Sequence, residues 1–121
     1  MSRWPWGDTE EPGRANVAVT REQISALGPV VAYETGENPV GVLQMVGNVW
    51  EMVTDTPPAE MVALYRKQIS TGVEAGERWV LIRGGSYKEP LDQNILWDGV
   101  AVPAGRPGSL VGFRCVKDHI R

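Results

Sequence analysis

Few residues of this sequence have the type and spacing that catalysis requires. There is one histidine, His119, and one cysteine, Cys115, so an internal disulfide is excluded. No cluster of cysteines and histidines has the spacing of a zinc site. No glycine-rich loop stands between a strand and a helix, as a phosphate-binding loop would. The residues by themselves therefore predict neither a nucleophile with its base nor a zinc centre.

The segment 88–109 is the strongest candidate for a binding site. Six of its 22 residues are glycine or proline, so we predict a long ordered loop, and such loops are usually functional or disordered. An aromatic side chain among flexible polar neighbours is typical of binding surfaces. The candidate ligand-binding residues are Glu89, Gln93, Asn94, Trp97, Asp98 and Arg106. For Trp97 the alternative is an ordinary core position, and the sequence leaves both open.

Two short helices are predicted upstream of this segment. Thr20 and Gln23 have the spacing of a capping box, which begins a helix over 21–27 and turns Ile24 and Leu27 toward the core. A second helix begins after the prolines at 57–58, because proline is tolerated in the first turn. Its apolar face has helical spacing and is formed by Met61, Val62, Tyr65 and Ile69.

Three strands complete the predicted elements. Apolar and β-branched residues dominate 49–53, 79–82 and 110–116, which predicts a strand in each range. Glycine occurs 14 times and proline nine times, and five tryptophans stand against one phenylalanine. This composition predicts a loop-rich fold held together by aromatic packing. With the predicted helices and strands, the fold class is α+β.

Length and charge limit the classes of function. The 121 residues allow one domain, and the net charge of −3 gives no electrostatic reason to expect nucleic acid or an anionic membrane as partner. No apolar run has the length of a membrane span or of a signal peptide. We therefore expect a cytoplasmic protein or part of a larger assembly. Its partner would be a protein or a small molecule, with a complementary chain or a second copy as further possibilities.

Four segments resemble a known family when they are taken in order. They are Trp4-Pro5-Trp6-Gly7-Asp8, then Asn38-Pro39-Val40-Gly41 leading to Met45-Val46-Gly47-Asn48-Val49-Trp50-Glu51, then Arg83-Gly84-Gly85-Ser86-Tyr87, and finally Val111-Gly112-Phe113-Arg114-Cys115. The series is similar to the C-terminal half of formylglycine-generating-enzyme-like (sulfatase-modifying-factor) domains. The resemblance implies a C-type-lectin-like fold with small antiparallel sheets, and residues 1–121 would form the C-terminal part of one such domain.

The resemblance also predicts what this chain does not do. Glu89 and Asn94 stand where the catalytic members carry the two cysteines that hold copper, so no copper is expected. We therefore expect no enzyme but a ligand- or protein-binding module that recognises its partner through 88–109. One alternative is half of a metal-dependent oxidase or sulfoxide synthase whose metal ligands come from elsewhere. Another is a variable protein of a diversity-generating retroelement, or a phage structural protein.

The resemblance also offers a calcium site. Its ligands would be the side chains of Gln44 and Glu51 and the backbone carbonyls of Gly47 and Val49, which are the oxygen donors that calcium prefers. The alternative is that Glu51 is an ordinary carboxylate paired with a cation such as Arg83 or Arg114.

Overall fold

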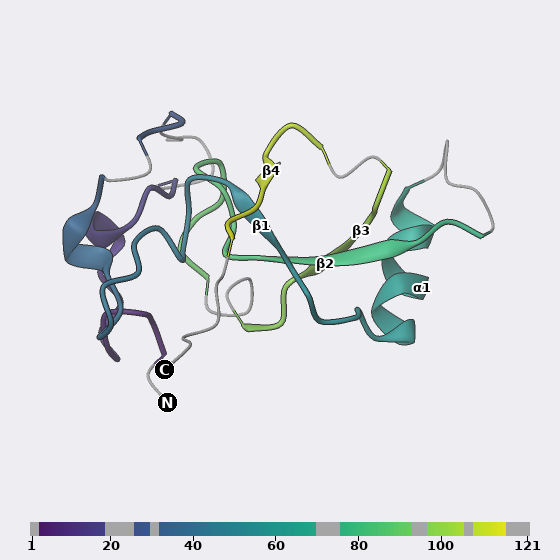
Figure 1. Cartoon of the computed structure of the whole chain (residues 1–121), viewed down its shortest axis with the longest axis horizontal. Helices are drawn as coiled ribbons and strands as arrows, with labels where there is room; N and C mark the ends of the chain where they lie inside the picture. Colours follow the sequence, from purple (N-terminus) through teal and green to yellow (C-terminus); the bar gives the residue numbers. More distant parts are fainter. Residues whose placement is uncertain are drawn as a thin grey trace.

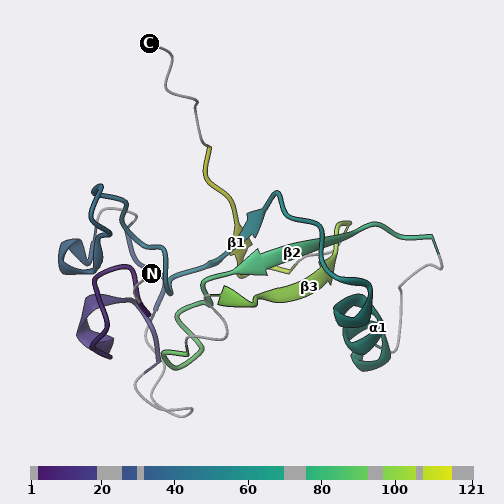
Figure 2. The same ribbon diagram turned by 90° about the horizontal axis from the view of Figure 1, so that it is seen from below.

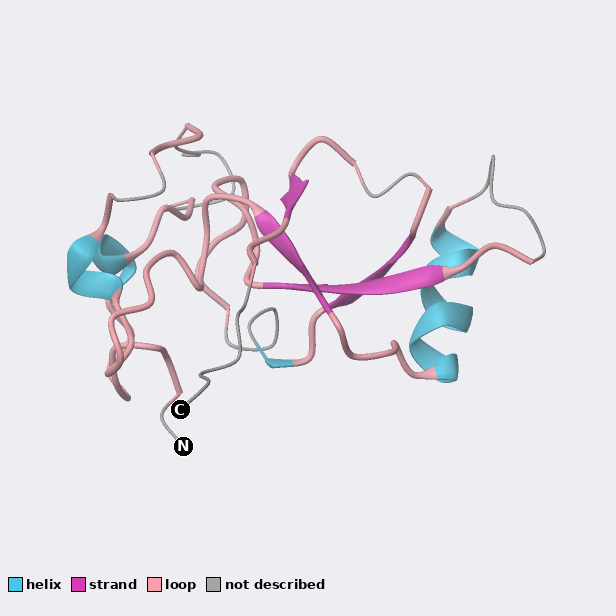
Figure 3. Ribbon diagram, viewed as in Figure 1, coloured by secondary structure: helices cyan, strands magenta, loops and turns pink. Residues whose placement is uncertain are grey.

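The computed structural model describes residues 3–18, 26–29, 32–69, 76–92, 97–105 and 108–115. A four-stranded sheet lies in the middle of the molecule, with the irregular N-terminal third on one side of it and helix α1 on the other (Figures 1 and 2). Loops and turns link these elements and make up much of the chain (Figure 3). The architecture is the loop-rich α+β fold that the sequence predicts.

The sheet is mixed rather than antiparallel. Its strands are β1 (Trp50–Val53), β2 (Trp79–Arg83), β3 (Val100–Pro103) and β4 (Val111–Gly112), in the order β3-β2-β1-β4. β2 is antiparallel to both of its neighbours, but β4 lies parallel to β1, so the predicted antiparallel sheet is wrong at this edge. A parallel pair needs a long crossover. The chain between β1 and β4 supplies one, because it contains α1, β2 and β3.

Strand β3 corrects the prediction that 88–109 is a single long loop. Ala101 is 1% exposed and faces the core, while its neighbours on both sides are only partly buried, which is the alternation of a strand. Pro103 ends the strand at the edge of the sheet, where a missing backbone N–H is tolerated. Gly99 and Gly105 therefore flank a strand, although glycines at these positions indicated a loop.

Helix α1 (Ala59–Gln68) confirms the second predicted helix. Proline stands at its N-cap, and Arg66 and Lys67 lie in the last turn, where positive charge favours the helix dipole. The helix contacts β3, and the Arg66 guanidinium lies 5.7 Å from the ring centre of Trp79. Within the described ranges, no helix combines the length and apolar character that crossing a membrane requires.

The first predicted helix, 21–27, lies mostly outside the described residues, and so do Thr20, Gln23 and Ile24. Its described end, Ala26 and Leu27, is not helical. Leu27 is 64% exposed, so its predicted position in the core is wrong. The carbonyl of Ala26 instead accepts a hydrogen bond from the Asn16 side chain, and the chain runs on in an irregular conformation.

A small apolar cluster stabilises the N-terminal third. Trp4, Ala15, Val17 and Val46 are buried together, and Trp6 and Leu91 pack against them. The rings of the two tryptophans stack with centres 5.8 Å apart and planes 9° from parallel. Trp50 and Trp79 are buried in the sheet. The abundance of tryptophan thus has the packing role that the composition predicts.

The turn at Gly47 and Asn48 joins this cluster to the segment that follows β2. The backbone N–H of Gly47 donates to the carbonyl of Gly84 (2.7 Å), and that of Asn48 donates to the carbonyl of Asn16 (2.8 Å). The N–H of Tyr87 donates to the carbonyl of Asn48 (3.0 Å). Gly47 has a φ of 79°, and an added Cβ would lie 2.4 Å from the Asn16 carbonyl oxygen. Only glycine therefore fits at this position.

Replacing Gly47 with alanine should destabilise the protein by about 3 kcal/mol, because the new methyl group collides with backbone and the positive φ is strained. The free energy of unfolding in urea measures this. Gly13→Ala is the matched control, since a Cβ there meets nothing within 4 Å, and it should change stability little. Equal free energies of unfolding for the two variants would show that the close approach of Gly47 to the Asn16 backbone does not constrain the residue at position 47.

Candidate functional site

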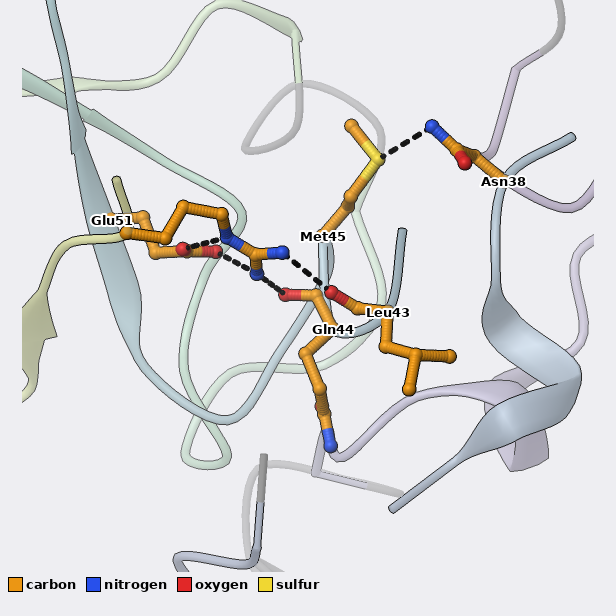
Figure 4. A network of polar contacts seen from close by, with 6 residues as sticks. Asn38, Leu43, Gln44, Met45 and Glu51 are labelled. Atoms are coloured by element: carbon orange, nitrogen blue, oxygen red, sulfur yellow. Dashed lines mark hydrogen bonds and ion pairs between the residues drawn. The ribbon is translucent and has the colours of Figure 1, made fainter. Parts of the chain in front are cut away.

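An arginine that follows β4, Arg114, binds the carboxylate of Glu51 in β1. Nε of Arg114 donates to Oε1 of Glu51, and its Nη2 donates to Oε2 at 2.8 Å (Figure 4). Nη1 donates to the carbonyl of Leu43 (2.8 Å), and Nη2 also donates to that of Gln44 (3.0 Å). The hydrogen bond with Glu51 raises the pKa of Arg114 above its ordinary value, against the opposing effect of burial. The guanidinium therefore carries its charge throughout the physiological pH range.

The loop that presents these two carbonyls is ordered by Asn38. Its Oδ1 accepts hydrogen bonds from the backbone N–H groups of Val40 (3.1 Å) and Val42 (2.9 Å), as asparagine commonly does in turns. Its Nδ2 lies 3.5 Å from the sulfur of Met45 (Figure 4). The residues on both sides of the two carbonyls are thus fixed by side-chain contacts.

The four predicted calcium ligands line one cavity of about 480 Å³, together with Phe113 and Arg114. They do not converge on one point. The amide of Gln44 points away from the Glu51 carboxylate (Figure 4). Its Nε2 donates to the carbonyls of Pro29 (3.1 Å) and Ala32 (3.0 Å). Its Oε1 is buried and has no donor among the described residues.

The alternative prediction for Glu51, pairing with a cation, is confirmed, and the cation is Arg114. Nη2 of Arg83 instead lies 3.5 Å from Oδ2 of Asp55. No group of three or more histidine, cysteine or acidic side chains within the described ranges could hold a metal ion. As arranged here, Gln44 and Glu51 do not turn their side-chain oxygens toward one point, because the Gln44 amide binds the carbonyls of Pro29 and Ala32 and the Glu51 carboxylate is paired with the guanidinium of Arg114. The calcium site stays a prediction.

Glu89, a candidate ligand-binding residue, closes the turn after β2. Its Oε2 accepts hydrogen bonds from the backbone N–H (2.7 Å) and the hydroxyl group of Ser86. Ser86 is fully buried, at 0% exposure. The carbonyl of Glu89 accepts the N–H of Ala18 at 2.9 Å, which ties this turn to the N-terminal third. Glu89 stands where the family's catalytic members carry a copper cysteine, and in this chain its carboxylate binds Ser86.

Trp97 lies on the surface rather than in the core. It is 41% exposed, and its Nε1 donates to the carbonyl of Arg3 at 3.0 Å. This favours the binding-surface interpretation of Trp97 over the core interpretation. Gln93, Asn94 and Arg106 lie outside the described residues, so their predicted roles stay predictions.

Asp98 lines a cavity of about 590 Å³ between α1 and the chain that enters β3. The residues around it are Glu60, Met61, Leu64, Tyr65, Asp92, Asp98, Gly99 and Val100. The sequence analysis missed the contribution of α1. It placed Met61 and Tyr65 on one apolar face of the helix, but helical spacing does not distinguish a buried face from one that lines an open cavity. The acidic residues at 60, 92 and 98 were the signal that could have found this site.

Comparison with known proteins identifies the family. The model of the sulfatase-modifying factor enzyme 1-like domain matches residues 1–119. The chain belongs to this family. It is also similar to hercynine oxygenase of Mycobacterium tuberculosis (strain ATCC 25618 / H37Rv), with 38% identity over 87 residues. The matched part is 70% of this chain but 20% of the relative, so the chain spans about a fifth of the length of the curated relative it matches.

Membership of the sulfatase-modifying-factor family confirms the resemblance but corrects the expectation that the chain is no enzyme. The similar curated protein is an oxygenase, and the family is named for an enzyme. That expectation depended on Glu89 and Asn94 in place of the copper cysteines. A missing thiolate pair bears on Cu(I), because other metals take other ligands. It therefore argues against one chemistry and leaves other enzymatic chemistries open.

Replacing Glu89 with alanine should lower the free energy of unfolding by about 2 kcal/mol, because two buried donors of Ser86 lose their acceptor. Glu89→Gln keeps an acceptor oxygen at the same distance from the backbone, so it should lose less. Urea denaturation of both variants measures this, with Glu10→Ala as an exposed control. If Glu89→Ala is as stable as the control, the carboxylate does not close the turn.

Proposed function

We propose that this chain is the substrate-recognising part of an oxygenase that acts on hercynine or a similar betaine. The observation that carries the proposal is the 38% identity with hercynine oxygenase over 87 residues. The matched region is a fifth of that protein, so the remaining parts of an active enzyme would come from elsewhere in the polypeptide or from a partner chain.

The described residues favour recognition over redox chemistry as the task of this segment. Reactions with oxygen are usually carried out by a metal or an organic cofactor, while the protein supplies binding and orientation. The described residues offer no group of side chains that fits a metal ion. We therefore assign the metal ligands of the proposed enzyme to residues outside the described ranges, and to this segment the positioning of the substrate.

The cavity between α1 and β3 supports a cationic substrate. Hercynine is the trimethylammonium betaine of histidine, so it has a permanent positive charge. Three acidic residues, at 60, 92 and 98, line the cavity together with Tyr65. Quaternary ammonium groups bind favourably to aromatic faces and in the field of nearby carboxylates. The trimethylammonium group has no proton to lose, so charge and shape alone would recognise it.

Two of these carboxylates are not used by the fold. Among the described residues, neither Glu60 nor Asp98 is engaged in a hydrogen bond or an ion pair, in contrast to Glu51 and Glu89. A side chain that the chain itself does not engage is available to a ligand. Asp98 lies in the segment 88–109, so this proposal keeps the predicted recognition segment and adds one face of α1 to it.

Asp98→Asn should raise the KM for hercynine about threefold to fivefold and leave kcat nearly unchanged, because an exposed charge pair contributes up to about 1 kcal/mol of binding. Oxygen consumption by the whole protein, purified with its metal, measures both constants. Asp55→Asn removes the same charge outside the cavity and is the matched control.

The two parts of the proposal fail separately. If the whole protein consumes no oxygen with hercynine, the proposed activity is wrong. If activity is present but Asp98→Asn and Asp55→Asn have the same KM, the activity stands and the assignment of the cavity is wrong.

A further inference from the structure

Four oxygen atoms converge on the guanidinium group of Arg114. Two belong to the carboxylate of Glu51, and the others are the backbone carbonyls of Leu43 and Gln44 (Figure 4). Carboxylate and carbonyl oxygens are the donors that a hard cation such as calcium takes in proteins. In this chain, the positive charge at the centre of these oxygens belongs to an arginine side chain.

The geometry suits a guanidinium better than a spherical ion. Nε and Nη2 bind the two carboxylate oxygens in a forked arrangement, and Nη1 and Nη2 reach the two carbonyls. This planar fork, which directs several N–H groups to separate acceptors, is what distinguishes arginine from a point charge. Calcium instead needs six or more oxygens, all about 2.4 Å from one centre. Glu51 is the one carboxylate that the predicted calcium site contains, and Arg114 engages both of its oxygens.

Displacement of Arg114 by a metal ion would be unfavourable. The guanidinium would lose four hydrogen bonds at once, and the Glu51 side chain, which is 18% exposed, would exchange one cation for another. Gln44 would also have to turn its amide toward Glu51, away from the carbonyls of Pro29 and Ala32 that it binds. Such a rearrangement would break contacts on both sides of the loop.

We propose that Arg114 is a built-in cation at this oxygen cluster. The turn between Leu43 and Glu51 closes around its guanidinium instead of around a metal ion, so wild-type stability does not depend on calcium. Arg114 and a divalent cation compete for the same oxygens. Removing the arginine therefore exposes a weak site for a divalent cation that contains Glu51. This inference concerns the scaffold and does not depend on the proposed activity.

The test is the melting temperature of the whole protein in excess calcium chloride and in chelator, at equal ionic strength. The wild type should melt at the same temperature in both. Arg114→Ala should melt roughly 5–10 °C lower in chelator, because a charged hydrogen-bond network is lost, and should regain several degrees, about half of this loss, in calcium. The double variant Arg114→Ala/Glu51→Gln should regain nothing. Lys67→Ala, which removes an exposed positive charge from α1, is the control and should resemble the wild type.

Two results would overturn the proposal. One is a wild type that melts at a higher temperature in calcium than in chelator, with the difference lost in Glu51→Gln, because calcium would then displace the guanidinium. The other is an Arg114→Ala protein that is as stable as the wild type. If Arg114→Ala does not fold, the wild type and Glu51→Gln decide the question: the same wild-type melting temperature in both solutions supports a built-in cation, and a calcium-dependent rise that requires Glu51 contradicts it.

Discussion

The close contact between the turn at 47–48 and the backbone of Asn16 is the constraint on which the rest of the structure depends. Asn16 and Asn48 are buried, and Nδ2 of Asn16 donates to Oδ1 of Asn48 (3.0 Å). The side chain of Asn48 also binds both backbone groups of Gly28, accepting from its N–H (2.9 Å) and donating to its carbonyl (3.2 Å). Because the two asparagine side chains are buried, leaving their polar groups unpaired would be unfavourable. The two asparagines thus fix three separate parts of the chain in one arrangement.

This constraint explains how a chain with so little regular structure positions its sites. β1 begins directly after the turn, so Glu51 is placed by the same contacts that fix Asn48, and the N–H of Tyr87 aligns the segment that carries Glu89. Arg114 then binds Glu51 and holds β4, which has two residues, beside β1. Short strands have few ladder hydrogen bonds, so side-chain contacts of this kind carry much of their stabilisation.

The sequence predicted the elements whose signals are local and missed those that depend on distant parts of the chain. β1, β2 and α1 follow from apolar periodicity and from proline at a helix start, both of which a short window contains. β3 was missed because the glycines and prolines around it dominate the window, whereas its pairing with β2 is decided by the buried Ala101 and by its place at the sheet edge. The parallel direction of β4 follows from the crossover of the intervening chain, which no short window shows.

In the candidate site, too, contacts that residue type indicates could be predicted, and those that depend on distant parts of the chain could not. The pairing of Glu51 with Arg114 could be proposed as one of two partners, because residue type predicts a salt bridge but not its geometry. The cavity at Asp98 was missed, since one of its walls is a face of α1, and helical spacing does not show what that face meets. The expectation of no enzyme failed for a related reason. It judged function from Glu89 and Asn94 in place of the copper cysteines, and Glu89 is a residue that the fold uses to close a turn around Ser86. Carboxylates that the fold does not engage, such as Asp98 and Glu60, are better guides to what a domain binds.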